Sequence, residues 1–409
     1  MTRPWRAADP ADAPGAGAAP PASRLTDPRT LLAVYAVATV LATVYKLARG
    51  KFEHGGRLYE PLQNYAIFRD AFHHLVAGKD LYASFPLETW DLYKYSPTFA
   101  LLMFPFAALP YGAGAVVWNL TNSLVLFAAV LSLPGFGDKA RGLVLWFVLL
   151  VALGSAQNAQ SNALMAGLML GAFSAKERGK DGLAAFCLVM ATFIKIFGGV
   201  LVVACLLRGG RGRLLRFLAL WGLVFLAAPL LVVSLEQLVS LYGSWHQLLL
   251  KDHGRSQGMS VMAWLKAWFG LALPKGAVVI AGAAVLLLPL AKVGAHADRT
   301  FRVLVLASAL IWVVIFNHMA ESPTFVIAVL GVALWYFVRP RNRFDQALLA
   351  LTFVFSCLSS TDLFPPAVWR RFVVPYVLKA APCIFVWVRI QYELLTFSSE
   401  RRAGDDDPS

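Results

Sequence analysis

The stretch FLALWGLVFLAAPLLVVSL, from Phe217 to Leu235, decides the fold class of this chain. It contains no charged residue, and it reaches the roughly 18 apolar residues that one helix needs to cross a lipid bilayer. Two other apolar blocks approach that length, LLAVYAVATVLATVYKL (Leu31–Leu47) and AVVIAGAAVLLLPL (Ala277–Leu290). The sequence therefore predicts an all-α integral membrane protein.

The composition of the whole chain supports this class. Hydrophobic residues make up 58% of the sequence and charged residues 15%, and the mean hydropathy is +0.63. A soluble protein has about 45–50% apolar and about 25% charged residues, so it could not bury this much apolar surface. The net charge of +14 comes from short basic clusters between apolar blocks. Such clusters indicate topology signals and contacts with anionic membrane lipids, and they argue against nucleic-acid binding.

Cysteine and histidine patterns give no metal site. The four cysteines lie in apolar stretches without CxxC spacing, which favours neither a disulfide framework nor a zinc site. His73 and His74 are adjacent, and adjacent side chains on a helix point about 100° apart, so they cannot easily chelate one ion. We therefore expect no metal ligands and no cofactor.

Apolar segments divide the chain into about twelve expected transmembrane helices. They cover residues 30–48, 113–134, 141–156, 161–176, 182–195, 196–207, 214–234, 276–295, 301–316, 322–338, 345–360 and 372–395. The fifth and sixth are short, and Lys195 with Gly198 and Gly199 lies where they meet. A lysine at the bilayer centre is costly, so we expect a break between two short helices that lines a polar cavity. The proline-containing piece 97–110 is expected to be a half-inserted helix rather than a full span.

The basic clusters predict the orientation of these helices. If the N-terminus is cytoplasmic, most of the clusters fall on the cytoplasmic side, as the positive-inside rule requires. Residues 1–28 and 397–409 are then a disordered and a polar cytoplasmic tail, and residues 29–396 form the transmembrane domain. Its first and fourth extracytoplasmic loops, residues 49–112 and 235–275, are long, and long loops in a compact protein are often functional.

Polar residues gather on the expected outer side, and they are the candidates for chemistry. A carboxylate of the first loop can act as a general base, and amides and cations near Lys195 can bind a phosphate. The catalytic candidates are Asp70 and Asp91. The substrate-binding candidates are Asn64, Lys94, Gln157, Asn158, Asn162, Lys195, His253, Arg255, Gln257 and His318. Solvated loop and turn residues are the alternative explanation for each of them.

Four stretches together resemble glycosyltransferase family 87, whose members are alpha-mannosyltransferase-like membrane enzymes of the GT-C fold. The stretches are NYAIFRDAFHHLVAGKDLY (Asn64–Tyr82), YKYSPTFALLMFPFAALP (Tyr93–Pro110), QNAQSNALMAGLML (Gln157–Leu170) and ATFIKIFGGVLVV (Ala191–Val203). The first ends in the family's G-x-D-L-Y pattern, and the last looks like its lysine-containing hairpin. One position departs from the family, because Asn64 stands where an early loop aspartate is usual, and an amide cannot accept a proton as a carboxylate does.

The resemblance implies a GT-C-like bundle of about twelve helices that uses a polyprenyl-phosphate-linked sugar. The expected function is transfer of a mannose-like hexose to an envelope lipid or glycan acceptor, on the extracytoplasmic face of a bacterial plasma membrane. In this hypothesis Asp70 or Asp91 activates the acceptor hydroxyl, and Lys195, helped by Arg255 or His253, balances the departing phosphate. The expected partners are membrane lipids, the lipid-linked donor and the acceptor. A transporter or flippase for a lipid-linked or small polar substrate is the alternative, and a catalytically silent scaffold is a third possibility.

Overall fold

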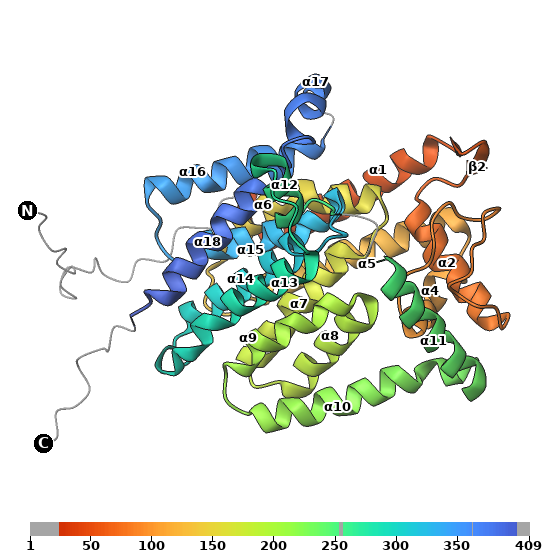
Figure 1. The fold of residues 1–409 in the computed structure, drawn as a ribbon, viewed down its shortest axis with the longest axis horizontal. Helices are drawn as coiled ribbons and strands as arrows, with labels where there is room; N and C mark the ends of the chain where they lie inside the picture. The colour runs from red at the N-terminus through yellow and green to blue at the C-terminus, as the bar shows by residue number, and fades with distance from the viewer. Residues whose placement is uncertain (1–23, 253–256, 362, 399–409) are drawn as a thin grey trace, which may run out of the picture.

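The protein is a bundle of helices, described in a computed structural model for residues 24–252, 257–361 and 363–398 (Figure 1). Most of the expected tail regions, 1–28 and 397–409, lie outside these residues, and so do His253 and Arg255. The α-helices are α1 (Pro28–Ala48), α2 (Gln63–Val76), α3 (Pro97–Leu102), α4 (Phe104–Ala107), α5 (Tyr111–Leu131), α6 (Asp138–Gln157), α7 (Asn162–Glu177), α8 (Asp181–Ile194), α9 (Val202–Leu206), α10 (Arg211–Ala227), α11 (Leu235–Asp252), α12 (Val261–Phe269), α13 (Lys275–Leu287), α14 (Arg299–Ile315), α15 (Phe325–Phe337), α16 (Arg343–Thr352), α17 (Pro366–Val368) and α18 (Ala381–Leu395).

Four helical segments of the described chain are long and apolar enough to cross a membrane. They are Pro28–Ala48, Tyr111–Leu131, Asp138–Gln157 and Arg211–Leu231. Large apolar side chains of α10, such as Leu220 and Leu223, are more than half exposed, at 53% and 66%. Apolar exposure along a whole helix is unfavourable in water and expected against lipid. These helices make the chain a multi-pass membrane protein.

The number of spans, about twelve, stays a prediction. Within the described residues, four further apolar helices have 10–17 residues, which is short for a straight crossing. The expected span 372–395 is not one helix: Val377 has a φ of 51°, and α18 begins only at Ala381. A branched side chain in the left-handed region cannot continue an α-helix. The proline-containing piece 97–110 forms α3 and α4, both too short to cross a bilayer.

A short hairpin departs from the all-α expectation. Strands β1 (Phe52–His54) and β2 (Arg57–Tyr59) pair antiparallel, with Phe52 opposite Tyr59. The turn residues Gly55 and Gly56 have φ values of 60° and 76°. Two consecutive positive φ angles define the tight turns that suit a hairpin, and glycine adopts them without strain. The dipeptide was the signal for this hairpin in the sequence.

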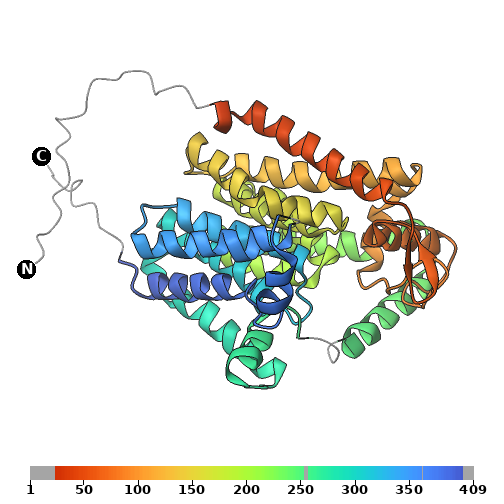
Figure 2. The same ribbon diagram turned by 90° about the horizontal axis from the view of Figure 1, so that it is seen from above.

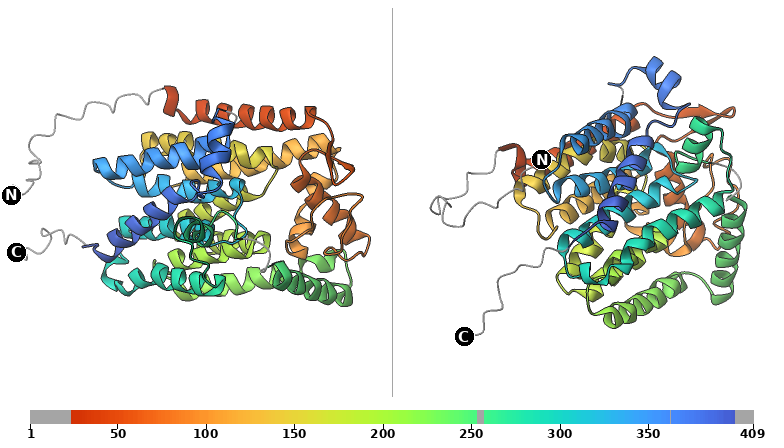
Figure 3. Two further views of the ribbon diagram at one scale, coloured as in Figure 1. Left: turned by 45° about the horizontal axis from the view of Figure 1, so that its top comes forward. Right: turned by 60° about the vertical axis from the view of Figure 1, so that its left-hand side comes forward.

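The hairpin, α2 and α11 lie at one end of the bundle, and the described chain begins and ends near the other (Figures 1 and 2). The two views of Figure 3 show the same separation, with α1 and α10 on opposite outer sides. The first long loop and α11 of the fourth are therefore gathered at one end, whereas α12, also in the fourth, packs near α18, where the Trp268 indole donates to the Tyr376 carbonyl. Which end faces the cytoplasm stays a prediction.

Buried ion pairs join three of the basic loops that the sequence predicts on one side of the membrane. The guanidinium of Arg302 donates to both carboxylate oxygens of Glu177, at 2.7 and 2.8 Å, and Arg208 lies 3.2 Å from the same carboxylate. The Lys176 ammonium lies 2.6 Å from a carboxylate oxygen of Asp181. The side chain of Glu177 is only 1% exposed. These pairs therefore fix the ends of α7, α8 and α14 against one another.

We expect Glu177→Gln to lower the free energy of unfolding by about 3–5 kcal/mol, because it leaves the buried Arg302 charge without its partner. The measurement is thermal unfolding of the purified protein in detergent. Asp138→Asn is the matched control, because Asp138 pairs with Arg141 at 3.0 Å but is 69% exposed. An exposed pair contributes about 0–1 kcal/mol, so equal shifts in the two variants would contradict the prediction.

The break at Lys195 is where the sequence predicts it. Helix α8 ends at Ile194, Lys195 is extended (φ −142°, ψ 124°), and a 3-10 helix, η3 (Ile196–Leu201), follows before α9. A Cβ atom on Gly198 would lie 2.6 Å from the carbonyl carbon of Ala191. Only glycine allows this approach, so Gly198 lets η3 fold back onto α8. The lysine is thereby held at the turn of a broken hairpin.

Candidate functional site

A cavity of about 500 Å³ lies beside α2 and the Lys195 break. Its walls come from α2, the segment before α3, the α6–α7 turn, the α8–η3 break, α11, α14 and the turn after α14. We call it the Lys195 cavity. Five of the residues that the sequence singles out line it, namely Asn64, Asp91, Lys94, Lys195 and His318. The fold thus brings together polar residues that are far apart in the sequence.

A chain of hydrogen bonds connects Lys195 with a carboxylate across the α7 end of the cavity. The Lys195 ammonium donates to Oδ1 of Asn162 at 2.7 Å, and the Asn162 amide donates to Oε1 of Gln160 at 2.5 Å. The Gln160 amide then donates to Oε2 of Glu321 at 2.8 Å. Every bond runs in the same direction, from the ammonium to the carboxylate. Because each amide both accepts and donates, the bonds polarise one another and fix both charges in place.

Lys195 has N–H groups available for a ligand. An ammonium carries three N–H donors, and the Asn162 bond uses one. The other contacts of the ammonium within the described chain are with ring faces, 5.7 Å from the Tyr95 centroid and 5.9 Å from the Phe197 centroid. Aromatic faces stabilise a cation without competing for its N–H groups. An anionic group can therefore bind Lys195 directly.

Much of the remaining lining of the same cavity is apolar. It consists of Ile194, Ile196, Phe197, Val200, Leu249, Trp312, Val313 and Phe316. Together with the ammonium, this lining suits a molecule that joins an anionic head to a hydrocarbon chain, since apolar area removed from water is stabilising.

Asp91 is the first-loop aspartate that lines the Lys195 cavity. One of its carboxylate oxygens lies 3.3 Å from the Lys94 ammonium, and Oδ1 accepts from the backbone N–H of Leu92 at 2.8 Å. The hydroxyl of Thr89 donates to the Asp91 carbonyl at 3.1 Å, which holds the turn. The Asp91 side chain is 45% exposed, so a substrate hydroxyl can reach the carboxylate.

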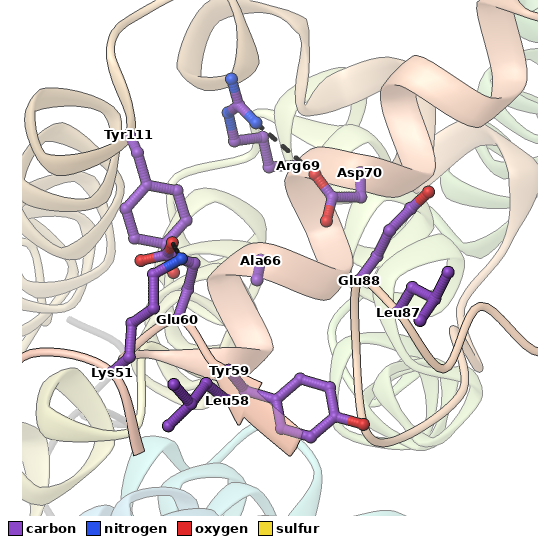
Figure 4. A pocket seen from close by; sticks show the side chains of 10 residues that line it. All are labelled: Lys51, Leu58, Tyr59, Glu60, Ala66, Arg69, Asp70, Leu87, Glu88 and Tyr111. Carbon is purple, nitrogen blue, oxygen red and sulfur yellow. Dashed lines mark ion pairs between the residues drawn. The ribbon is translucent and has the colours of Figure 1, made fainter. Parts of the chain in front are cut away.

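Asp70 faces a different cavity, of about 350 Å³, which Figure 4 shows. Around it lie Lys51, Glu60, Arg69 and Glu88, with the Lys51 ammonium 2.8 Å from Glu60 and Arg69 3.5 Å from Asp70. A void bordered by both Asp70 and Asp91 measures about 10 Å³, which is no more than one water molecule needs. The structure therefore separates the two aspartates that the sequence could not distinguish.

Burial raises the pKa of Asp70 to about 6, and the neighbouring Arg69 guanidinium opposes this only in part. Folding therefore shifts the carboxyl toward its neutral form, since an aspartate has a pKa of about 3.9 in the unfolded chain, but the folded protein still carries the charge above about pH 6. A group with a raised pKa in the folded state contributes stability that is present below the unfolded pKa and is lost as the pH rises through the folded pKa.

We therefore expect Asp70→Asn to raise the unfolding temperature at pH 7.5, by an amount equivalent to about 1–3 kcal/mol, because asparagine has no charge to bury. The difference from the unmutated protein should shrink between pH 6 and pH 4, where the aspartate is protonated anyway. Thermal unfolding in detergent over this pH range measures both. Parallel curves with a constant offset would show that the charge of Asp70 is not the cause.

The other candidate residues that the structure describes do not line the Lys195 cavity. Asn158 is exposed, and its carbonyl accepts from the Asn64 side chain at 2.9 Å. Gln157 is half-buried at the end of α6 and is not among the residues that line the cavity. The carbonyl of Gln257 accepts from the Ser260 hydroxyl at 2.5 Å, and Gln257 does not line the cavity either. Asn162 is buried and acts through its bond to Lys195.

Glu321 and Gln160 belong to the site but are missing from the candidates chosen by sequence. Both line the Lys195 cavity and complete the hydrogen-bonded chain. The backbone N–H of Glu321 donates to the Thr324 hydroxyl at 3.3 Å, at the start of α15. A carboxylate between two apolar spans is energetically costly unless it has a function or a partner. The position of Glu321 between two apolar segments could therefore have indicated a functional residue from the sequence.

Comparisons with known proteins identify the family. A model described as glycosyltransferase family 87 matches residues 93–323, more than half of the chain, including the whole chain of bonds from Lys195 to Glu321. No curated protein matches significantly. Among solved structures, the chain is similar to one titled "Crystal Structure of ArnT from Cupriavidus metallidurans bound to Undecaprenyl phosphate", with 13% identity and a TM-score of 0.41 over 89% of this chain and 76% of that chain. The family match is sufficient by itself: the protein belongs to glycosyltransferase family 87.

Proposed function

We propose that this membrane glycosyltransferase moves a mannose-like hexose from a polyprenyl-phosphate donor to a lipid or glycan acceptor. The single observation that carries the proposal is the Lys195 cavity, which combines a positioned ammonium, an apolar lining and an accessible carboxylate. The reaction is placed on the extracytoplasmic face of a bacterial plasma membrane, with both termini in the cytoplasm. Support for this orientation comes from the basic loops, which share ion pairs away from the cavity.

The chemistry follows from the positions of the charges. The Asp91 carboxylate takes the proton from an acceptor hydroxyl, and the hydroxyl oxygen attacks the anomeric carbon of the donor. The bond between that carbon and the phosphate oxygen breaks, and the phosphate leaves with the electron pair. Lys195 balances the negative charge that develops on the leaving phosphate, held in place by Asn162. One displacement of this kind inverts the configuration of the sugar.

Asn64 has a positioning role in this scheme. Its side chain lines the cavity, and its amide N–H donates to the Asn158 carbonyl. The amide oxygen cannot act as a base, but it can accept a hydrogen bond from a sugar hydroxyl. The proton is therefore assigned to Asp91 rather than to the position where the family usually has an aspartate.

The test is a transfer assay with the purified protein in lipid nanodiscs. Polyprenyl-phosphate mannose and polyprenyl-phosphate glucose, each with a radiolabelled sugar, are supplied with membrane glycolipid and oligosaccharide acceptors. We expect label to move from the lipid-linked donor to an acceptor, with release of polyprenyl phosphate. Transfer from nucleotide sugars alone, with no use of a lipid-linked donor, would contradict the proposal. Vectorial movement of an unchanged donor would instead favour the transporter alternative.

A further inference from the structure

A second cavity adjoins the Lys195 cavity at Asp91. It measures about 440 Å³ and shares Asp91, Leu92 and Lys94 with the Lys195 cavity. We call it the Trp90 cavity. Its other polar and aromatic lining includes Tyr59, Tyr82, Ser84, Thr89, Trp90 and Lys251. Asp91 thus borders a largely apolar space on one side and a space rich in rings and hydroxyls on the other.

The aromatic rings of the Trp90 cavity are fixed in place. The Trp90 ring is half exposed (50%) and packs on His54 of β1, with centroids 4.8 Å apart. The Tyr59 hydroxyl donates to the Pro86 carbonyl at 2.9 Å, and the Tyr82 hydroxyl donates to the Tyr95 carbonyl at 2.9 Å. A ring that is already ordered loses little entropy on binding, so it makes an efficient contact surface.

Helix α11 closes the cavity from the other side. It contributes Leu248 and Lys251 to the wall, and hydrogen bonds join it to residues of the first long loop, 49–112. The Trp245 indole donates to the Lys94 carbonyl at 3.1 Å, and the Ser244 hydroxyl lies 3.3 Å from a carboxylate oxygen of Asp80. The cavity is therefore built from two ordered walls.

This lining matches the chemistry of a sugar ring. A pyranose presents C–H groups on its faces, which pack on aromatic rings, and hydroxyls on its rim, which need hydrogen-bonding partners. Trp90 supplies an exposed ring, and Thr89, Ser84, Asp91 and Lys251 supply polar groups around it. A hydrocarbon chain would cover Ser84 and Lys251 without offering either a hydrogen-bonding partner, which is unfavourable.

We propose that the Trp90 cavity binds the acceptor, and that the acceptor is a glycan whose terminal sugar packs on Trp90 with one hydroxyl directed to Asp91. The assignment of this saccharide as the acceptor rests on the proposed function, whereas the binding of a saccharide in this cavity does not. The two substrates then approach Asp91 from opposite sides, with the lipid-linked donor in the Lys195 cavity. The single carboxylate that both cavities share receives the proton.

The experiment measures saccharide binding without any donor. The full chain in nanodiscs is titrated with soluble oligomannosides, oligoglucosides and oligogalactosides, and binding is read by saturation-transfer NMR. We expect at least one series to bind, with affinity reduced about 10-fold or more in Trp90→Ala and by less than about 3-fold in Trp90→Phe. Trp369→Ala is the matched control, because Trp369 is also exposed (38%) but lies beside α17, far from α2 (Figure 1). Its affinity should be unchanged.

Each outcome separates this inference from the proposed function. If no saccharide binds, or if Trp90→Ala binds as tightly as the unmutated protein, the Trp90 cavity is not a glycan site. Transfer from a lipid-linked donor to a non-saccharide lipid, with no saccharide binding, would overturn the inference and leave the proposed function standing. Saccharide binding that depends on Trp90, in a protein that turns over no lipid-linked donor, would support the site and overturn the proposed function.

Discussion

Replacement of Asp91 by asparagine is expected to lower kcat by about 10²–10⁴-fold, the range that a positioned general base contributes. The asparagine side chain has nearly the same shape, and its amide oxygen can still accept the Leu92 backbone N–H, a bond that is 2.8 Å long with the aspartate. The turn should therefore stay folded while the proton acceptor is lost. The KM for the donor should change little, because the phosphate is bound by Lys195 in this account.

Asp70→Asn is the matched control for this prediction. It makes the same chemical change in the same loop, but in the cavity of Figure 4, away from Lys195. We expect it to keep most of the transfer activity. Loss of activity in Asp70→Asn with full activity in Asp91→Asn would assign the base to Asp70 and contradict the geometry.

Glu321 is the other carboxylate of the Lys195 cavity that could serve as a base. Its Oε2 already accepts from Gln160, and that bond ends the chain that begins at Lys195. Glu321→Gln would weaken the orientation of Lys195, so it should raise the KM for the donor as well as lower kcat. This double effect distinguishes a positioning carboxylate from Asp91.

Replacement of Lys195 by methionine is expected to lower kcat/KM for the lipid-linked donor by about 10²–10³-fold, the loss that follows removal of one donor from a preorganised anion site. Methionine has an unbranched side chain of similar length, so it fills much of the same space. The phosphate would then enter an apolar cavity without a cation to balance its charge. Steady-state kinetics with radiolabelled donor measures the effect.

A second readout shows whether Lys195 acts on the phosphate. Polyprenyl phosphate, the released product, should inhibit the unmutated enzyme and inhibit Lys195→Met much less. Lys195→Arg should recover part of the binding, because it keeps the charge but changes the shape of the donor group. Unchanged product inhibition in Lys195→Met would mean that the ammonium does not contact the phosphate.

The sequence predicted the Lys195 break because the signal is local. A charge inside an apolar stretch, with Gly198 and Gly199 beside it, implies a helix that cannot continue through the bilayer. The structure adds the reason for the glycine, since a Cβ atom at Gly198 would collide with Ala191. The family resemblance could also be recognised from the sequence, because its motifs are short and ordered along the chain. The family match confirmed it.

The choice between Asp70 and Asp91 could not be made from the sequence. It depends on how the segment after α2 folds back, which is set by long-range bonds such as that from the Tyr82 hydroxyl to Tyr95 and from the Trp245 indole to Lys94. The bond between Gln160 and Glu321 spans 161 positions, so no periodicity or local motif reveals it. The Gly55–Gly56 dipeptide indicates a turn, but residues 49–112 were described from the sequence only as a loop, so the hairpin was not predicted.

A structure of the full chain in nanodiscs with polyprenyl phosphate bound tests most directly whether Lys195 binds the donor phosphate. We expect a phosphate oxygen about 2.7–2.9 Å from the Lys195 ammonium, the usual length of a charge-assisted hydrogen bond, with the hydrocarbon chain beside Trp312 and Phe316. Phosphate bound instead between Lys51 and Arg69, in the cavity that holds Asp70, would contradict this expectation.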